Sequence, residues 1–343
     1  MADLTDQIRP NRIVFLLLPE FSMMAFSAAL EPLRAANRMY DGELYDWKLV
    51  STDGEPVTAS NGVTVSVGGM LDNSQPCDML VVCAGLNTAT HCNRELAAKL
   101  RPLARTTPIV GGVCTGSVAL AKAGLLDGYR CTIHWEDLIS FAENFPHLEI
   151  TGRLYEVDRD RFTCSGGIAP LDLMIHLIGR DFGRELAAKV AEQMIHHMAR
   201  EAHEPQRLSL IERTGVRHPK LLQALAIMEE TIETPRSLDM IAAMAHLSAR
   251  QMERLFQFHF ARTPKRYYLD LRLARARHLL QHTALSIVQI ALATGFSSAA
   301  HFNKAYRQAF NHTPRSERTG KSEPSGISKD PPSEELARNE SEG

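Results

Sequence analysis

The sequence predicts two domains of different class, an α/β N-terminal domain and an all-α C-terminal domain with two helix-turn-helix motifs. Up to about residue 200, short apolar runs alternate with amphipathic stretches, which is typical of a mainly parallel sheet covered by helices. Beyond residue 220 helical spacing dominates, and the stretch 237–314 contains nearly the same pattern twice. At 343 residues the chain is long enough for two domains with separate cores.

Continuous apolar runs mark the expected strands of the N-terminal domain. Strands are expected at 13–18, 47–51, 63–67, 79–83, 108–113, 149–155 and 161–164. Helices are expected at about 22–39, 94–105, 171–180 and 184–197. Pro32 is expected to kink the first helix or to mark a junction in it.

Composition sets the predicted domain boundaries. The segment 201–219 is polar, lacks periodicity and contains Pro205 and Gly215, so it is the predicted linker. The end of the chain has almost no large apolar residues and is expected to be disordered. The predicted parts are an N-terminal arm (1–11), the α/β domain (12–200), the linker (201–219), the helical domain (220–318) and the tail (319–343).

Charge divides the chain in the same way. Residues 218–318 carry 14 Lys and Arg against seven Asp and Glu, whereas the remainder carries 24 against 33. A basic segment joined to an acidic domain indicates that only the C-terminal part meets a polyanion.

The cysteines and the start of the chain indicate the compartment. Six cysteines, all before residue 165, show neither a Cys-x-x-Cys pair nor a zinc-type Cys/His spacing, so we expect free thiols, no metal and no cofactor. The start MADLTDQIRPNR is polar and the run IVFLLLP is too short to span a bilayer. We therefore expect a cytoplasmic protein in a reducing compartment, without a membrane partner.

The repeat consists of two helix-turn-helix units. SLDMIAAMAHLSARQMERLFQFHFARTP (237–264) aligns with SIVQIALATGFSSAAHFNKAYRQAFNHTP (286–314), the second copy being one residue longer past the turn. The matched positions are Ile241 with Ile290, Ala242 with Ala291, Met252 with Phe302, Phe256 with Tyr306, Phe260 with Phe310, Thr263 with Thr313 and Pro264 with Pro314. Two short helices around a tight turn, with a polar face on the second, match the plan of a DNA-reading helix-turn-helix.

The polar face of each second helix is the predicted DNA interface. Apolar residues at helical spacing bury the opposite face, and Ser248 is the expected N-cap of the first recognition helix. Arg, Gln and Asn side chains read base edges, small residues contact thymine methyl groups, and Lys and Arg bind phosphates. The predicted DNA-binding residues are Arg250, Gln251, Glu253, Arg254, Ser298, Ala300, His301, Asn303, Lys304 and Arg307. Glu253 either accepts from a cytosine amino group or orients an arginine.

Residues 264–281 are predicted to form one helix between the two units. At 1.5 Å per residue it is about 27 Å long, which suits two recognition helices in successive major grooves about 34 Å apart. Its basic residues either contact phosphate or belong to solvated and ion-paired faces, and both interpretations stay open for Arg266, Arg272, Arg275 and Arg277.

Over about residues 220–318 the chain resembles the AraC/XylS family of transcriptional regulators. The resemblance is carried by SLDMIAAMAHLSARQMERLF, LRLARARHLL and SIVQIALATGFSSAAHFNKAYRQAFNHTPRSER, with Ile290-Ala291, Gly295-Phe296 and Thr313-Pro314 in place. It implies that the two predicted recognition helices read double-stranded operator DNA.

In the N-terminal domain, Gly112-Val113-Cys114-Thr115-Gly116 lies where a strand gives way to a helix. Small residues beside a nucleophile allow a sharp elbow, and the helix N-terminus there lowers a thiol pKa or holds an anion. The same pattern also suits a small buried hydrophobe, so Cys114 has two open interpretations.

The stretch IVGGVCTGSVALAKAGLLDGYRCTIHW (109–135) resembles the PfpI/ThiJ-like branch of the class I glutamine amidotransferase-like superfamily, and the resemblance covers roughly residues 12–200. It implies a flavodoxin-like doubly wound sheet with a pocket at the carboxyl ends of the strands. The predicted ligand-binding residues are Glu20, Phe21, Gly85, Leu86, Cys114, Thr115, His134, Trp135, Ser165, Gly166, Gly167 and Ile168.

The resemblance also bears on catalysis. Active members carry an acidic residue in the first helix, where this chain has Ala25, and Glu31 lies about two turns further on. His134 is either near the elbow or a structural histidine. We therefore predict a sensor without catalytic residues. The elbow would suit the carboxylate of a ligand. Trp135 or Phe21 would face a cationic nitrogen of the same ligand. The alternative for Trp135 is a side chain packed in the core.

The two resemblances, in this order, are similar to a subgroup of AraC-type regulators with an amidotransferase-like domain. Its members include activators that respond to glycine betaine, carnitine, arginine and related amines. The resemblance implies an activator of a catabolic operon that binds operator DNA, a small zwitterionic effector and RNA polymerase, and that dimerises through its N-terminal domain. The alternatives are a cysteine hydrolase or hydratase that carries a DNA-binding module, and a DNA binder that responds to no ligand.

Overall fold

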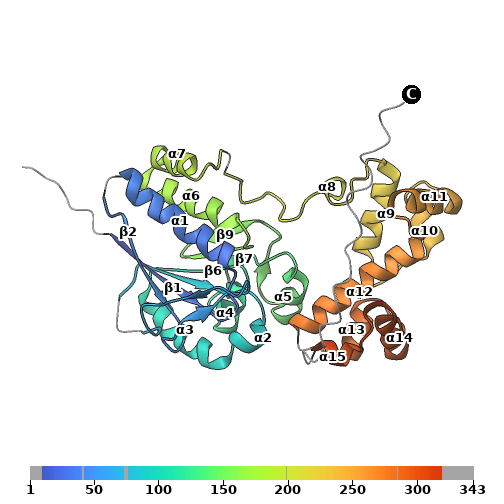
Figure 1. Cartoon of the computed structure of the whole chain (residues 1–343), viewed down its shortest axis with the longest axis horizontal. Helices are drawn as coiled ribbons and strands as arrows, with labels where there is room; N and C mark the ends of the chain where they lie inside the picture. The colour runs from blue at the N-terminus through green and yellow to red at the C-terminus, as the bar shows by residue number, and fades with distance from the viewer. Residues whose placement is uncertain (1–9, 41, 73–75, 198, 284, 319–343) are drawn as a thin grey trace, which may run out of the picture. The chain divides into compact units, whose positions relative to one another are not determined.

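The structure is a computed structural model that describes residues 10–40, 42–72, 76–197, 199–283 and 285–318 (Figure 1). It divides into an N-terminal unit that ends at Arg217 and a C-terminal unit that begins at His218. The span predicted as linker contains the short helix α8 (Leu210–Thr214), which begins with a capping box between Ser209 and Glu212. The predicted tail and most of the predicted arm lie outside the described residues.

A six-stranded sheet forms the centre of the N-terminal unit. Its strand order is β2-β1-β5-β6-β10-β9, and all neighbours are parallel except β9 and β10. The five parallel strands follow the flavodoxin-like order, so the predicted fold class is confirmed. The strands are β1 (Asn11–Leu17), β2 (Tyr45–Val50), β5 (Met79–Cys83), β6 (Ile109–Val113), β9 (Tyr155–Asp158) and β10 (Arg161–Cys164).

Two of the predicted strands differ from the structure. Within 63–67 only β4 (Thr64–Val65) forms, and it pairs with β3 (Val57–Thr58) outside the main sheet. The span 149–155 is divided, because β8 (Glu149–Ile150) pairs with β7 (Arg130–Cys131) whereas Tyr155 already begins β9. Gly152, which contributes no side chain to a strand face, lies in the break between them.

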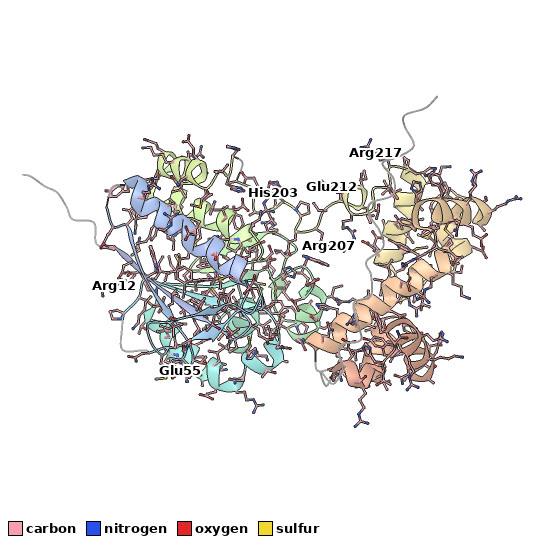
Figure 2. The ribbon with its side chains drawn as sticks, viewed as in Figure 1. Arg12, Glu55, His203, Arg207, Glu212 and Arg217 are labelled. Carbon is pink, nitrogen blue, oxygen red and sulfur yellow. The ribbon has the colours of Figure 1, made fainter. Side chains whose placement is uncertain are left out.

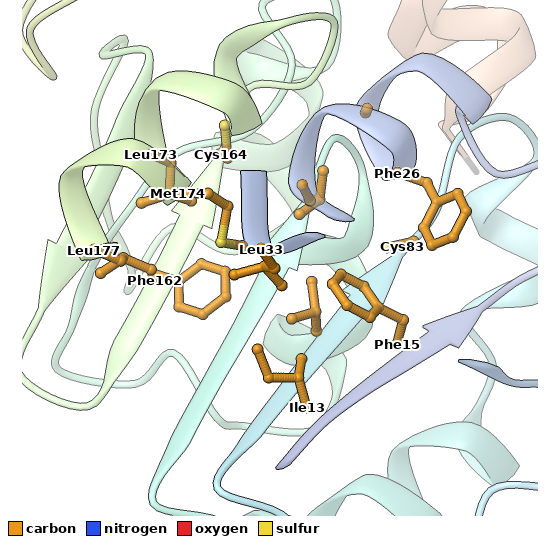
Figure 3. Packing of buried hydrophobic residues seen from close by; sticks show 14 of the residues in the cluster. Ile13, Phe15, Phe26, Leu33, Cys83, Phe162, Cys164, Leu173, Met174 and Leu177 are labelled. Carbon is orange, nitrogen blue, oxygen red and sulfur yellow. The ribbon is translucent and has the colours of Figure 1, made fainter. Parts of the chain in front are cut away.

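Helices cover both faces of this sheet (Figure 1). On one face, side chains such as Phe15, Phe26, Leu33 and Phe162 interdigitate between strands and helices (Figure 3). The helices of that face are α1 (Met23–Tyr40), α6 (Ala169–Phe182) and α7 (Arg184–Gln193). The other face carries α3 (Arg94–Thr106), α4 (Gly116–Lys122) and α5 (Leu138–Asn144), and the single turn α2 (Thr88–His91) follows β5.

Helix α1 runs through Pro32 without a break, so the junction expected there is absent from this described helix. Pro32 is buried beside Leu33, which packs in the core between helix and sheet. Packing of the apolar face against the sheet therefore holds the helix together across a residue that disfavours helix locally.

The C-terminal unit is helical throughout its described residues. It begins with α9 (Pro219–Glu230), and the helix α12 (Pro264–His282) joins two helix-turn-helix units. The first unit is α10 (Leu238–Met244) with α11 (Ala249–Phe260), and the second is α13 (Ile287–Ala293) with α14 (Ala299–Phe310), followed by α15 (Pro314–Arg318).

The predicted repeat is confirmed residue by residue. Ile241, Met252 and Phe256 are buried, as are their counterparts Ile290, Phe302 and Tyr306. Both copies use serine N-caps at the same places, since Ser237, Ser248, Ser286 and Ser298 all accept a backbone N–H of the first turn.

Helix α12 holds the two copies in one folded unit. Near its start, Tyr267 packs against Phe256 with ring centroids 5.3 Å apart, and the Tyr268 hydroxyl donates to the Thr231 carbonyl oxygen at 2.7 Å. Near its end, Leu273 and Leu280 enter the core of the second copy. The two recognition helices are therefore carried by a common rigid element.

Across the described residues, no helix has the length and apolar composition needed to cross a membrane. The same residues contain no group of three or more His, Cys, Asp and Glu that could hold a metal ion. The six cysteines are all buried and unpaired.

Candidate DNA interface and ligand pocket

Recognition helix α11 has one buried and one open face. Met252 and Phe256 are buried, whereas Arg250, Glu253 and Arg254 are exposed. Arg250 and Arg254 are four residues apart and therefore lie on the same face of the helix. Among the described residues neither arginine has a hydrogen-bond or ion-pair partner, so both guanidinium groups are open to an external acceptor.

Recognition helix α14 repeats this arrangement. Phe302, Ala305 and Tyr306 are buried against the second core. The exposed residues recur at helical spacing along the opposite face, and they include four predicted DNA-binding residues, Ala300, Asn303, Lys304 and Arg307.

Three of the predicted DNA-binding residues have structural contacts as well. The Gln251 amide oxygen accepts the Ser248 backbone N–H at 2.9 Å and completes a capping box. The Ser298 hydroxyl caps α14 by accepting the His301 backbone N–H at 3.2 Å, and the His301 ring lies 5.5 Å from that of Phe296. These contacts fix where each recognition helix begins, and direct DNA contacts by the three residues stay a prediction.

The arginines of α12 are engaged inside the C-terminal unit. Arg272 donates to the Thr294 carbonyl oxygen at 2.8 Å with its guanidinium 4.2 Å from the Phe296 ring centroid. Arg277 donates to Glu317 at 3.2 Å, and Arg266 pairs with Asp270 at 2.9 Å. The basic residues of this helix were expected either to contact phosphate or to lie on solvated and ion-paired faces. Arg266, Arg272 and Arg277 form contacts inside the unit, as the second interpretation expects.

The predicted elbow of the N-terminal unit is present between β6 and α4. Cys114 has a left-handed backbone with φ 58°, which a non-glycine residue adopts only when its surroundings enforce it. A Cβ on Gly116 would lie 2.1 Å from the Val82 carbonyl oxygen, and one on Gly112 would lie 2.8 Å from the Gly116 backbone. The two glycines are required because the backbone passes so close to its neighbours at this turn.

The Cys114 thiol is not activated. Its pKa is raised to about 12, mainly by burial and to a smaller extent by the carboxylates of Asp137 and Glu136, and a backbone N–H from Thr115 only partly offsets this rise. At neutral pH the thiol is therefore protonated. Ala25, at the position where active relatives carry an acid, is buried, and Glu31 pairs with Arg34 at 2.6 Å.

Four loops that carry predicted pocket residues converge at the carboxyl edge of the sheet. The Thr115 hydroxyl donates to the Gly85 carbonyl oxygen at 2.6 Å, and the Leu86 N–H donates to the Glu20 carbonyl oxygen at 3.1 Å. Gly166 lies so close to Cys114 that a Cβ on it would be 2.9 Å from the sulfur. The predicted residues after β1, β5, β6 and β10 are thus brought together.

These residues differ in how far they can meet a ligand. Phe21 is fully buried and packs edge-on against Phe26, so its ring belongs to the core. Cys114, Thr115, Ser165 and Gly166 are buried and Gly167 is half-buried. The large apolar side chains at the surface are Leu86, Trp135 and Ile168, with 47%, 37% and 50% of their area exposed. These three are the exposed apolar members of the predicted ligand-binding set.

Glu20 lies at a polar part of this edge. Its carboxylate accepts from the Asn87 amide at 2.5 Å and lies 3.1 Å from the His91 imidazole. His91 also lines a cavity of about 560 Å³ beyond the ends of β1 and β2, together with Pro19, Asp53 and Lys99. Asn87 and His91 were not expected from the sequence, because nothing in its spacing indicates contacts with a residue about 70 positions away.

Trp135 and its neighbours form the remaining part of the site. The His134 imidazole lies 3.6 Å from the Glu136 carboxylate, and burial lowers its pKa although Glu136 opposes this. The guanidinium of Arg207 lies over the Trp135 ring at 4.6 Å from its centroid. Arg207 belongs to the predicted linker (Figure 2), where no periodic pattern marks a contact.

Both units match known families. Residues 241–320 match a family described as a helix-turn-helix domain, and residues 11–179 match the DJ-1/PfpI family. The HTH-type transcriptional regulator GbdR of Pseudomonas aeruginosa is 45% identical over 311 residues, which are 91% of this chain and 85% of that protein. The regulator CdhR of the same species is 44% identical over 304 residues, 89% of this chain and 90% of that protein.

Solved structures agree with these matches. The crystal structure of an AraC family transcriptional regulator from Pseudomonas putida superposes with a TM-score of 0.50 at 33% identity, covering 54% of this chain and 100% of that one. The chain therefore belongs to the AraC-type helix-turn-helix transcriptional regulators that carry an N-terminal DJ-1/PfpI domain.

Proposed function

We propose that this DNA-binding regulator is a cytoplasmic activator of a catabolic operon, controlled by a small amino acid or quaternary amine that binds at the carboxyl edge of the N-terminal sheet. The observation that carries the effector class is the Trp135 ring, which is partly exposed and holds a guanidinium 4.6 Å from its centroid. An aromatic face that accepts one cation within about 6 Å suits another of similar size.

The predicted pocket supports binding in preference to catalysis. Its thiol is neutral at physiological pH because burial and two carboxylates disfavour the thiolate. The exposed apolar side chains of Leu86, Trp135 and Ile168 would supply the apolar surface that a methylated nitrogen requires. A contact between the effector carboxylate and the elbow stays a prediction.

The DNA-binding half of the proposal assigns base contacts to Arg250 and Arg254 and phosphate contacts to Lys304 and Arg307. Arg254→Ala is expected to weaken binding about 5- to 150-fold to an operator selected by the protein from random duplexes, because one bidentate base contact is lost. Lys189→Ala is the charge-matched control, since Lys189 pairs with Glu185 on the N-terminal unit. Equal affinity of Arg254→Ala and wild type would contradict the assigned interface.

A second candidate function is favoured by the elbow itself, whose left-handed Cys114 between two required glycines resembles that of a cysteine hydrolase or hydratase. Cys114→Ser separates the two functions. We expect inducible reporter transcription to survive in the variant, because the thiol is a protonated buried group. Loss of a measurable turnover with intact transcription would instead favour the enzyme.

We also propose that the regulator acts as a homodimer on paired half-sites and contacts RNA polymerase. A homodimer with two-fold symmetry binds two equivalent DNA half-sites. Each chain supplies two recognition helices on one rigid unit. Sedimentation of the protein on an operator with one or two half-sites would measure the stoichiometry directly.

A further inference from the structure

The start of the predicted linker is docked on the N-terminal unit. The Leu154 N–H donates to the Ala202 carbonyl oxygen at 3.0 Å, and Arg153 forms an antiparallel bridge with Pro205. The Gln206 amide nitrogen then lies within 3.0 Å of three acceptors: the Thr132 hydroxyl and the Ile133 and Arg153 carbonyl oxygens. The docked residues 202–207, called here the latch, end at Arg207 (Figure 2). The Arg207 guanidinium lies over the Trp135 ring.

The ring contact at the end of the latch is weak. A cation over a partly exposed aromatic ring corresponds to about two- to fivefold in an equilibrium constant. The Gln206 amide oxygen is buried without a hydrogen-bond partner within the described part of the chain. Because an unpaired buried acceptor costs free energy, the docked state is destabilised at the residue next to Arg207. A ligand of modest affinity is therefore able to release it.

Arg207 occupies the ring that the proposed effector requires. The Trp135 ring has the His134 ring as a further neighbour, with centroids 5.7 Å apart. A guanidinium and a quaternary ammonium group cannot occupy the same aromatic face at once. An effector that binds on the face covered by Arg207 therefore binds only the state from which Arg207 is absent. This difference in affinity between the two states is what a switch needs.

We propose that Arg207 is an intramolecular occupant of the effector's cation site, and that a cationic effector displaces it and frees the latch from the N-terminal unit. This inference rests on the function proposed above. In the docked state the tether between the latch and His218 is residues 208–217, which include helix α8 and the buried Val216. After release it starts behind Arg200, which stays anchored to Asp172 at 2.7 Å. The tether gains residues 201–207, or roughly 23 Å of extended reach.

Hydrogen exchange of the Leu154 amide measures the latch in the full-length protein, since that amide donates to Ala202. Without ligand, Arg207→Ala is expected to speed this exchange about two- to fivefold, whereas Arg207→Lys, which keeps a cation, and Lys189→Ala leave it near the wild-type rate. Glycine betaine and tetramethylammonium, as probes, are expected to speed it in wild type and to bind Arg207→Ala about two- to fivefold more tightly.

Unchanged Leu154 exchange in Arg207→Ala, or slower exchange on adding a bound probe, overturns the latch. If neither protein binds any probe, the effector class proposed above is wrong, and the ligand-free comparison decides the latch by itself. In that case the latch is supported if Leu154 exchanges faster in Arg207→Ala than in wild type and the basal reporter transcription of the variant differs from that of wild type. Unchanged Leu154 exchange overturns the latch. If both proteins bind a probe with equal affinity, the proposed function stands but Arg207 does not occupy the effector's cation site.

Discussion

Single backbone positions show how tightly the two helix-turn-helix copies correspond. His246 in the first turn and Gly295 in the second are equivalent in the repeat, and both have left-handed backbone, with φ 54° and 72°. The glycine has a further role, because a Cβ there would lie 2.3 Å from the Pro235 ring and 2.6 Å from the Ile232 carbonyl oxygen. The second turn thus fits against the loop that precedes the first copy.

Gly295→Ala is predicted to destabilise the C-terminal unit by about 2–4 kcal/mol, since the added methyl group meets backbone and ring atoms and the left-handed conformation is strained. Gly215→Ala is the matched control, because Gly215 has φ 67° but open space around its Cβ position. The control should cost only about 1 kcal/mol. Urea unfolding of the full-length protein, followed by circular dichroism, measures both variants. Equal costs would show that the contact with Pro235 is unimportant.

At the scale of single residues, the sequence predicts the site where local geometry determines it. The elbow at Cys114 and the Ser248 cap follow from short patterns, and both are confirmed. The partners of Glu20 and the contact of Arg207 with Trp135 could not be predicted. They join segments about 70 positions apart, so they exist only after the sheet has brought its loops together.

Among the elements, α12 joins both helix-turn-helix copies, and the short helix α15 closes the second. Glu317 of α15 is almost fully buried and accepts from Tyr306 at 2.9 Å, Gln281 at 2.6 Å and Arg277 at 3.2 Å, and also contacts His312. Burial raises its pKa, but these hydrogen bonds and the Arg277 charge outweigh burial and lower it to about 2. One carboxylate thus ties α12, α14 and α15 together.

Glu317→Ala is predicted to cost about 2–4 kcal/mol, because it leaves Arg277 and the buried Tyr306 hydroxyl without their acceptor. Glu317→Gln keeps a neutral acceptor and should cost less. Since the folded pKa is lower than the unfolded value of 4.5, the carboxylate stabilises the unit above pH 4.5 and loses this effect as the pH falls toward 2. A stability difference between wild type and Glu317→Gln that stays constant from pH 7 to pH 3 would contradict this role.

The elements themselves were largely predictable, since their apolar period is strong. The exceptions are informative: Pro32 is accommodated inside α1 by packing, and 149–155 is divided between two sheets. In both cases a tertiary contact outweighs the local pattern.

For the whole molecule, the two units differ in chemistry as well as fold. Every cysteine lies in the N-terminal unit and is buried. Burial raises the pKa of Cys92, Cys114, Cys131 and Cys164 to about 12 and also raises those of Cys77 and Cys83. These thiols stay neutral in the folded chain at a pH where the unfolded chain ionises.

The free energy of unfolding is therefore predicted to be insensitive to these thiols below pH 9 and to fall as the pH rises from 9 to 12. Each of the four thiols whose pKa is about 12 contributes about 1.4 kcal/mol per pH unit in that range. Urea midpoints measured from pH 8 to pH 10.5 under reducing conditions test this. Cys114→Ser should make the pH dependence of the unfolding free energy less steep, by the amount that corresponds to about one proton released on unfolding. A midpoint that is independent of pH across this range would refute the burial of the thiols.

A small effector bound to the N-terminal unit is proposed to change how the C-terminal unit binds DNA. The direct measurement is the affinity of the full-length protein for its selected operator, with and without saturating glycine betaine, carnitine or arginine. One of these is predicted to change the operator Kd about 5- to 150-fold, with DNA changing the effector affinity by the same factor, and Trp135→Ala is predicted to remove the change. If no member of the panel alters operator affinity while Arg254→Ala still weakens binding, the protein is a DNA binder without ligand control and the proposed effector control is wrong.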